Sequence, residues 1–244
     1  MRRLSRLALL LALVPAGATP LLAQAAPTTL TFSTVLDALE STISQRVLTE
    51  AYRRIGIDVR VQRFPGDSAL QRANSGAVDG DLQRIDFIEV EAPNLVQVPV
   101  PIAYLEVGVF SHDPMYRVRS WLDLRDRRVG VVKGILAVQR AMGDVRVREV
   151  DSYGELYRAM ARGEVDAIVV GTQYLAAVPL LAKDTKPLYL SGVLDTYMLY
   201  HHLHRRHAAL VTEIEPVLKS MLMDGTIARM RADVIADVMR GGRP

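Results

Sequence analysis

The chain has 244 residues, with 30 basic side chains, 27 acidic side chains and no cysteine. Its length suits one large domain or two small lobes, and the lack of cysteine excludes disulfide bonds and a lipid-anchored lipoprotein. The sequence has no basic stripe interleaved with aromatic residues, which argues against nucleic-acid binding. Beyond the first 25 residues, no apolar run is long enough to predict a membrane span.

The first residues have the pattern of a cleaved secretory signal. A basic start with Arg2, Arg3 and Arg6 precedes an apolar run over 7–14, which is too short to span a bilayer. Ala23-Gln24-Ala25 then forms an A-x-A processing site, with Ala16-Gly17-Ala18 as a second possible site. We therefore expect a signal peptide over 1–25 and a periplasmic protein, the alternative being an uncleaved anchor. Cleavage would leave 27 basic residues against 27 acidic ones.

Strands and helices are expected to alternate through the first part of the remaining chain. Apolar residues four apart, from Ile43 to Ile55, predict a helix that Gly56 ends. The segment 94–101 contains two prolines and is expected to be extended but irregular. The other elements expected here are strands at 30–33, 57–62, 78–82 and 104–111 and a short helix at 68–74.

The second part repeats the alternation of strand and helix. Ser152, with Glu155 three residues later, is typical of a capping box and predicts a helix that ends at Gly163. Strands are expected at 128–132, 145–150, 165–170, 187–190 and 196–202. Further helices are expected at 136–142 and 172–181, from the end of the last strand to about residue 223, and at 225–239.

A short motif, Gly-x-Val-Asp, occurs twice, at 76–79 and at 163–166. Each copy follows an amphipathic helix, and glycine tolerates the left-handed backbone just past a helix end. The two copies indicate two similar α/β units, in which Asp79 and Asp166 have structural roles. We expect an α/β fold with mainly parallel sheets, with lobe 1 over 28–111 and 196–244 and lobe 2 over 112–195. Two chain crossings, near 111–114 and 191–195, would form a hinge.

Several stretches give the chain a likeness to a known family. They are Ser120 to Gly134, Glu149 to Val170, Asn74 to Gly80 and Leu218 to Ile227. In order and spacing they resemble the bacterial extracellular solute-binding proteins of family 3, periplasmic receptors for polar amino acids and related small solutes. The resemblance implies a two-lobe periplasmic-binding-protein type II fold, binding of a small solute by lobe closure, and delivery to an inner-membrane ABC permease. It also implies a monomer that has no cofactor.

Arg84 is the sharpest candidate for a binding residue. It follows the strand 78–82, and ligands bind at the carboxyl ends of strands in open α/β sheets. A planar guanidinium binds carboxylate through two hydrogen bonds, and the resemblance gives Arg84 that role. The alternative is an ion pair with Asp81, Asp86 or Glu89. The resemblance also places the backbone amides after Gly134 at the same anion. The full expected binding set is Arg84, Thr34, Gly134, Ile135, Leu136, Gly171 and Thr172.

Two positions depart from the family pattern. The family often has an acidic residue after the strand 165–170, where it holds a ligand α-amino group, but this chain has Gly171 and then Thr172. The family commonly has an aromatic lid in the first-lobe loop, but the segment 33–37 has none. Asp37 or Glu40 could replace the missing acid, and spacing alone does not choose between them. These departures favour an organic acid or a different polar solute over an amino acid.

Other chemistry has weaker support in the sequence. His201, His202, His204 and His207 form a cluster, but no HExxH pattern or cysteine accompanies them, so we expect no metal site. A G-x-S-x-G motif and the phosphate-binding glycine patterns are missing, so we expect a binding protein and not an enzyme. The alternatives are a dehydratase-type enzyme on the same fold and a sensor or interaction protein that has lost the ligand site.

Overall fold

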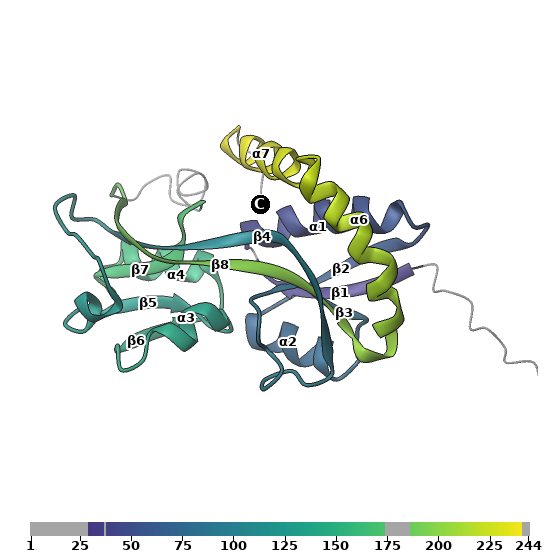
Figure 1. The fold of residues 1–244 in the computed structure, drawn as a ribbon. Helices are drawn as coiled ribbons and strands as arrows, with labels where there is room; N and C mark the ends of the chain where they lie inside the picture. Colours follow the sequence, from purple (N-terminus) through teal and green to yellow (C-terminus); the bar gives the residue numbers. More distant parts are fainter. Residues whose placement is uncertain (1–28, 37, 174–185, 241–244) are drawn as a thin grey trace, which may run out of the picture.

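The computed structural model describes residues 29–36, 38–173 and 186–240, which form two lobes joined by two long strands (Figure 1). The strands make one eight-stranded sheet with the order β2-β1-β3-β8-β4-β7-β5-β6. The first three strands belong to lobe 1, the last three belong to lobe 2, and β8 and β4 run through both. The predicted α/β class and two-lobe type are confirmed. Among the described residues, no helix is long and apolar enough to cross a membrane.

Lobe 1 begins with a parallel three-stranded unit. Its elements are β1 (Thr29–Val35), α1 (Leu39–Arg53), β2 (Asp58–Phe64), α2 (Gly66–Asn74) and β3 (Gly80–Arg84). β1 pairs in parallel with both β2 and β3. α1 covers one face of these strands and α2 the other (Figure 1). α1 buries the apolar face that the four-residue spacing predicts, including Ile43, Val47 and Ala51.

Lobe 2 repeats this plan with shorter elements. They are a 3₁₀ turn η1 (Trp121–Leu124), then β5 (Val129–Val132), α3 (Leu136–Ala141), β6 (Val147–Val150), α4 (Tyr153–Ala161) and β7 (Ala167–Gly171). β5 pairs in parallel with β6 and β7. Ser152 caps α4 by accepting a hydrogen bond from the Glu155 backbone amide at 3.2 Å, as the sequence predicts. Most of the predicted helix at 172–181 lies outside the described residues.

Two long antiparallel strands, β4 (Leu95–Ser111) and β8 (Tyr189–His204), carry the chain between the lobes. The segment 94–101 is extended and irregular, as expected, but it is the first part of the long strand β4, whereas the prediction of two separate strands within β8 is wrong. The register of the pair shifts on both sides of Pro101, and such irregularities let a sheet absorb residues that lack an N–H. β4 already pairs with β7 from Val107, so it enters lobe 2 before Ser111, near which the sequence places the crossing.

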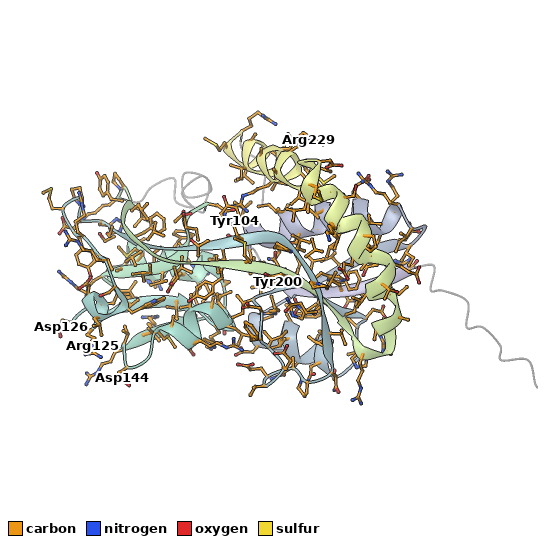
Figure 2. All side chains as sticks on the ribbon, in the orientation of Figure 1. Tyr104, Arg125, Asp126, Asp144, Tyr200 and Arg229 are labelled. Carbon is orange, nitrogen blue, oxygen red and sulfur yellow. The ribbon has the colours of Figure 1, made fainter. Side chains whose placement is uncertain are left out.

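The C-terminal segment returns to lobe 1. It consists of the 3₁₀ segment η3 (Arg205–Leu210), α6 (Val211–Met223) and α7 (Thr226–Met239). α6 buries its apolar face, which includes Ile214 and Leu218, in a cluster with Phe32 of β1. α7 extends above β4 (Figure 1), where the Arg231 guanidinium stacks 3.5 Å from the ring centre of Tyr104. Tyr104 is labelled in Figure 2 between β4 and α7.

The two Gly-x-Val-Asp motifs make the same contacts in both lobes. The Asp79 carboxylate accepts a hydrogen bond from the Thr31 amide at 2.8 Å, and the Asp166 carboxylate accepts one from the Arg128 amide at 3.1 Å. The backbone amide of each aspartate donates in return to the carbonyl of the same residue, at 2.7 Å in both lobes. Each motif therefore fastens the start of a neighbouring strand, which agrees with the predicted structural role.

Candidate functional site

A small cavity lies between the lobes at the carboxyl ends of the parallel strands. Arg84 and Glu40 line it from lobe 1, and Ile135, Leu136 and Tyr153 line it from lobe 2. Leu105 and Leu199 of the two long strands also contribute to the wall. The space that a water-sized sphere can reach is about 50 Å³, which is room for only a few atoms. A solute of amino-acid size therefore requires the lobes to separate further than they do here.

Arg84 ends β3 and connects the two lobes. Its side chain is 5 % exposed, and its Nε donates to Oδ2 of Asp81 at 3.0 Å. Nη1 donates to the carbonyl oxygen of Gly134 in lobe 2 at 3.1 Å, and Nη2 donates to the carbonyl of Gly66 at 3.3 Å. Asp81 is one of the partners that the sequence offers for Arg84. The guanidinium charge is thus balanced within lobe 1, while part of its donor edge faces lobe 2.

The lobes are closed against each other around Arg84. Gly134 has φ +73°, and a Cβ at this position would overlap the backbone of Gly66 and Asp67. Conversely, a Cβ on Gly66 would lie 2.6 Å from the Lys133 carbonyl oxygen. Backbone meets backbone here, which only glycine permits. Arg140 of α3 adds a second connection through its ion pair with Glu91 at 2.8 Å.

The other residues of the expected binding set have different positions. Ile135 and Leu136 line the cavity, whereas Gly134 presents its carbonyl oxygen to Arg84. Thr34 is buried, and its hydroxyl lies 2.8 Å from the Ser41 hydroxyl. Gly171 ends β7 and lines a separate, smaller cavity that shares Leu105 and Ile135 with this one, and the Thr172 hydroxyl donates to Glu106 at 2.6 Å. The cavity lining brings together Arg84, Ile135 and Leu136, and it does not include Thr34, Gly134, Gly171 or Thr172.

Glu40 is the acidic group of the cavity. It lies in the first turn of α1 and is 3 % exposed, and its Oε1 atom has no hydrogen-bond partner among the described residues. Burial raises the pKa of the Glu40 carboxyl to about 7, opposed by a hydrogen bond to its own backbone and by the charge of Arg231. The sequence offers Asp37 and Glu40 as equal substitutes for the missing acid. Glu40 lines the cavity, and Asp37 lies outside the described residues.

The histidine cluster has structural contacts. His201 is buried, with Nδ1 3.0 Å from the Asp81 carbonyl oxygen and Nε2 2.9 Å from the Tyr52 hydroxyl. Burial lowers its pKa to about 4, so the ring is neutral and can donate at one nitrogen and accept at the other. His207 lies at the far end of β3, where its Nε2 is 2.7 Å from Asp79. Within the described ranges, no group of three potential metal ligands occurs.

A second, more open hollow lies at the far end of lobe 2 from the cavity. Arg125, Arg128, Arg148 and Glu164 are among the residues that line it, and Figure 2 labels Arg125 at this end. Its charges are partly paired internally, as Arg128 with Asp166 at 2.5 Å and Arg148 with Glu164 at 2.7 Å. Unlike this hollow, the cavity between the lobes is lined by buried charged groups and by residues of both lobes, so it is the better candidate site in the described part of the chain.

Comparison with known proteins gives likenesses in structure more than in sequence. No family model matches the chain. An uncharacterized protein of Shewanella oneidensis is 21 % identical over 198 residues, which is 77 % of this chain and 74 % of that protein.

Three solved structures resemble the whole two-lobe arrangement. A mutant of ArgBP from T. maritima matches with a TM-score of 0.72 and 16 % identity over 86 % of this chain and 96 % of its own. The GluR0 ligand-binding core in complex with L-glutamate matches with a TM-score of 0.71 and 16 % identity, over 86 % and 99 %. The amino acid ABC transporter substrate-binding protein AbpA of Streptococcus pneumoniae, bound to L-arginine, matches with a TM-score of 0.67 and 12 % identity, over 87 % and 96 %. All three are ligand-binding proteins, and this chain has the two-lobe fold of the family 3 solute-binding proteins.

Proposed function

We propose that the chain binds a small carboxylate solute, an amino acid or an organic acid, by closing its two lobes around it. The observation that carries this proposal is the position of Arg84, buried at the end of β3 with its donor edge directed at lobe 2. A guanidinium has five N–H donors in a planar fork that matches a carboxylate. When the lobes open, the Gly134 carbonyl moves away and leaves donors free for a solute oxygen.

The proposal extends to transport and location. The signal-like first 25 residues support export to the periplasm. Delivery to an ABC permease is supported by the shared fold with a substrate-binding protein of such a transporter. The chain acts in this proposal as a binding protein with no reaction of its own, held together by its core without a cofactor.

The test is a thermal-shift screen of amino acids and organic acids on the protein without residues 1–25. A solute that binds only the folded state raises the melting temperature, and at a hundredfold excess over Kd it adds about 2.7 kcal/mol of stability. Arg84→Ala should abolish the shift. Arg84→Lys keeps a positive charge beside Asp81 but loses the planar fork, and it should weaken the shift. An equal shift in wild type and both variants would show that Arg84 does not hold the solute.

A further inference from the structure

The open hollow at the far end of lobe 2 has a lining that is rich in arginine. The space that a water-sized sphere can reach there is about 690 Å³, against about 50 Å³ in the cavity between the lobes. Figure 2 labels Arg125 and Asp126 of the lining, and Asp144 at the same end of the lobe. Among the described residues, the basic side chains of the lining are Arg125, Arg127, Arg128, Arg146 and Arg148, and the acidic ones are Asp126 and Glu164.

The hollow and the cavity lie at opposite ends of the parallel strands of lobe 2. Val129 and Val147, the first residues of β5 and β6, line the hollow and pair with each other. Ile135 and Leu136, which follow the carboxyl end of β5, line the cavity. The two sites have no lining residue in common, so a molecule in the hollow leaves the cavity free.

The strands of lobe 2 hold these arginines close together. Arg128 directly precedes β5, and Arg146 directly precedes β6, the strand beside it. Arg148 follows two residues after Arg146, a spacing at which strand side chains share a face. The Arg127 guanidinium lies 4.7 Å from the ring centre of Tyr116, a cation–π contact that orients it. Guanidinium groups from neighbouring segments therefore converge on one hollow.

Two acidic side chains at this end already have arginine partners. Glu164 forms ion pairs with Arg148 at 2.7 Å and with Arg162 at 2.6 Å. Asp166 forms one with Arg128 at 2.5 Å. A hydrogen bond from Arg162 lowers the pKa of Glu164, and one from Arg128 lowers the pKa of Asp166. These five side chains together carry one positive charge more than negative charges.

Three further arginines of the lining, Arg125, Arg127 and Arg146, have no ion pair within 4.0 Å among the described residues. All three are exposed, and Asp126 is the remaining acid of the described lining. Beyond residue 25 the chain has as many acidic as basic side chains, 27 of each, so the excess in the hollow is local. The hollow therefore concentrates positive charge on a protein of balanced charge.

The chemistry of the lining favours phosphate over other anions. Every cation of the described lining is an arginine, and a guanidinium binds phosphate oxygens through two parallel hydrogen bonds. One arginine is enough for one carboxylate, whereas a terminal phosphate has three acceptor oxygens and nearly two charges. An anion with several phosphates can therefore engage several arginines at once. The described lining has no aromatic side chain on which a nucleic-acid base could stack.

We propose that this hollow binds a compact anion that carries two or more phosphate groups, with Arg125, Arg127 and Arg146 as the arginines that it pairs. The phosphates belong either to a free anion or to the headgroup of a lipid. This inference does not depend on the proposed function, because the hollow lies outside the cavity between the lobes.

The first experiment measures binding of inorganic triphosphate by calorimetry to the protein without residues 1–25. The buffer contains about 0.15 M salt, because attraction between charges more than about 8 Å apart is then largely screened. A short polyglutamate peptide is the comparison probe. Tighter binding of triphosphate than of the peptide supports the inference. Absence of triphosphate binding, or equal or tighter binding of the peptide, overturns it.

The second experiment repeats the titration with Arg125→Ala and Arg146→Ala. Neither side chain has an ion pair in the described part of the chain, so both variants should fold as wild type does. Each should weaken triphosphate binding at least about tenfold, since each removes a charged hydrogen-bond donor. Arg60→Ala is the matched control, because Arg60 is an exposed arginine of β2 in lobe 1. Unchanged Kd in both hollow variants, or equal weakening in Arg60→Ala, overturns the site.

The third experiment separates the two sources of phosphate by co-sedimentation with vesicles. Phosphatidylcholine vesicles with cardiolipin, whose headgroup carries two phosphates, are compared with vesicles of phosphatidylcholine alone. Binding to the cardiolipin vesicles that triphosphate and Arg146→Ala both abolish supports a lipid headgroup in the hollow. Absence of vesicle binding, with triphosphate binding intact, supports a free anion. Vesicle binding that neither triphosphate nor Arg146→Ala reduces overturns the lipid headgroup as a ligand of this hollow.

Discussion

At the scale of single residues, the cavity combines a balanced arginine with an unbalanced glutamate. Arg84 has its counter-ion in Asp81, with side chains that are 5 % and 0 % exposed. Glu40 has no such partner among the described residues, and burial raises the pKa of its carboxyl to about 7. A group of this kind destabilises the empty folded protein when it is charged.

Glu40→Gln should therefore stabilise the protein without solute at high pH. The folded-state pKa of about 7 exceeds the usual 4.5, so the folded protein binds the extra proton between these values. Wild-type stability at pH 8 is reduced accordingly, and the variant should gain on the order of 2 kcal/mol there. The gain should shrink as the pH falls from 7 to 4.5, where wild-type Glu40 is neutral as well. Urea unfolding at a series of pH values measures the difference, and a difference that does not change with pH would contradict the assignment.

The sequence predicts Arg84 and the helix after Gly134 but does not choose Glu40. Arg84 is predicted as a binding residue from its position after a strand, because the strand ends of parallel sheets share one edge. Glu40 lies in the approach to a helix, and spacing does not tell which way such a residue faces. The one signal in the sequence is Gly171, where the family pattern has an acidic side chain and this chain has none. The contact between Glu40 and Gly171 joins residues far apart in sequence and depends on how the lobes meet.

At the scale of elements, the sequence predicts features that depend on a few neighbouring residues better than strands that depend on pairing with a distant part of the chain. The glycines after helices, the capping Ser152 and the two Gly-x-Val-Asp motifs all act over a few residues, and the structure has them as expected. The sequence predicts β4 only in part, because Pro99 and Pro101 interrupt its pattern. Its stability comes from pairing with β8, almost a hundred residues later in the chain, which no local pattern can show.

The two motif aspartates should differ in importance for stability. Asp79 has a side chain that is 20 % exposed, and it contacts Arg206 at 2.6 Å and His207 at 2.7 Å in addition to Thr31. The Asp166 side chain is 35 % exposed, and among the described residues its hydrogen bonds and its ion pair are all with Arg128. We expect Asp79→Ala to cost about 2 to 3 kcal/mol and Asp166→Ala about 1 kcal/mol.

Urea unfolding of both variants measures this difference. Asp79→Asn is a control that keeps an acceptor for the Thr31 amide while removing the negative charge, so it should lose less stability than Asp79→Ala. Asp79 is more buried and has more partners than Asp166, so a larger loss of stability in Asp166→Ala than in Asp79→Ala would contradict this prediction.

At the scale of the whole molecule, closure depends on the contact between Gly134 of lobe 2 and Gly66 of lobe 1. The two backbones lie so close that either Cβ would overlap the other lobe. Two arginines add contacts across the same junction. Arg84 of lobe 1 donates to the Gly134 carbonyl of lobe 2, and Arg140 of α3 in lobe 2 forms an ion pair with Glu91 of lobe 1. The long strands β4 and β8 connect the lobes continuously, so opening has to come from bending of these two strands.

Gly134→Ala should therefore hold the lobes apart. The methyl group would overlap the backbone of lobe 1, and the φ of +73° adds local strain of about 1 kcal/mol. Gly163→Ala is the matched control, because Gly163 has φ +69° and nothing within 4 Å of the added Cβ. Both variants carry the same kind of backbone strain, and only the first meets the other lobe.

Small-angle X-ray scattering, with and without a bound solute, separates the two effects. Gly134→Ala should have a larger radius of gyration than wild type in the presence of solute, and it should bind the solute more weakly because lobe 2 cannot complete the cavity. Gly163→Ala should lose a similar amount of stability but compact as wild type does. If solute reduces the radius of gyration of Gly134→Ala as much as that of wild type, the lobes close without the contact between Gly134 and Gly66. The closed arrangement described here would then differ from the solute-bound one.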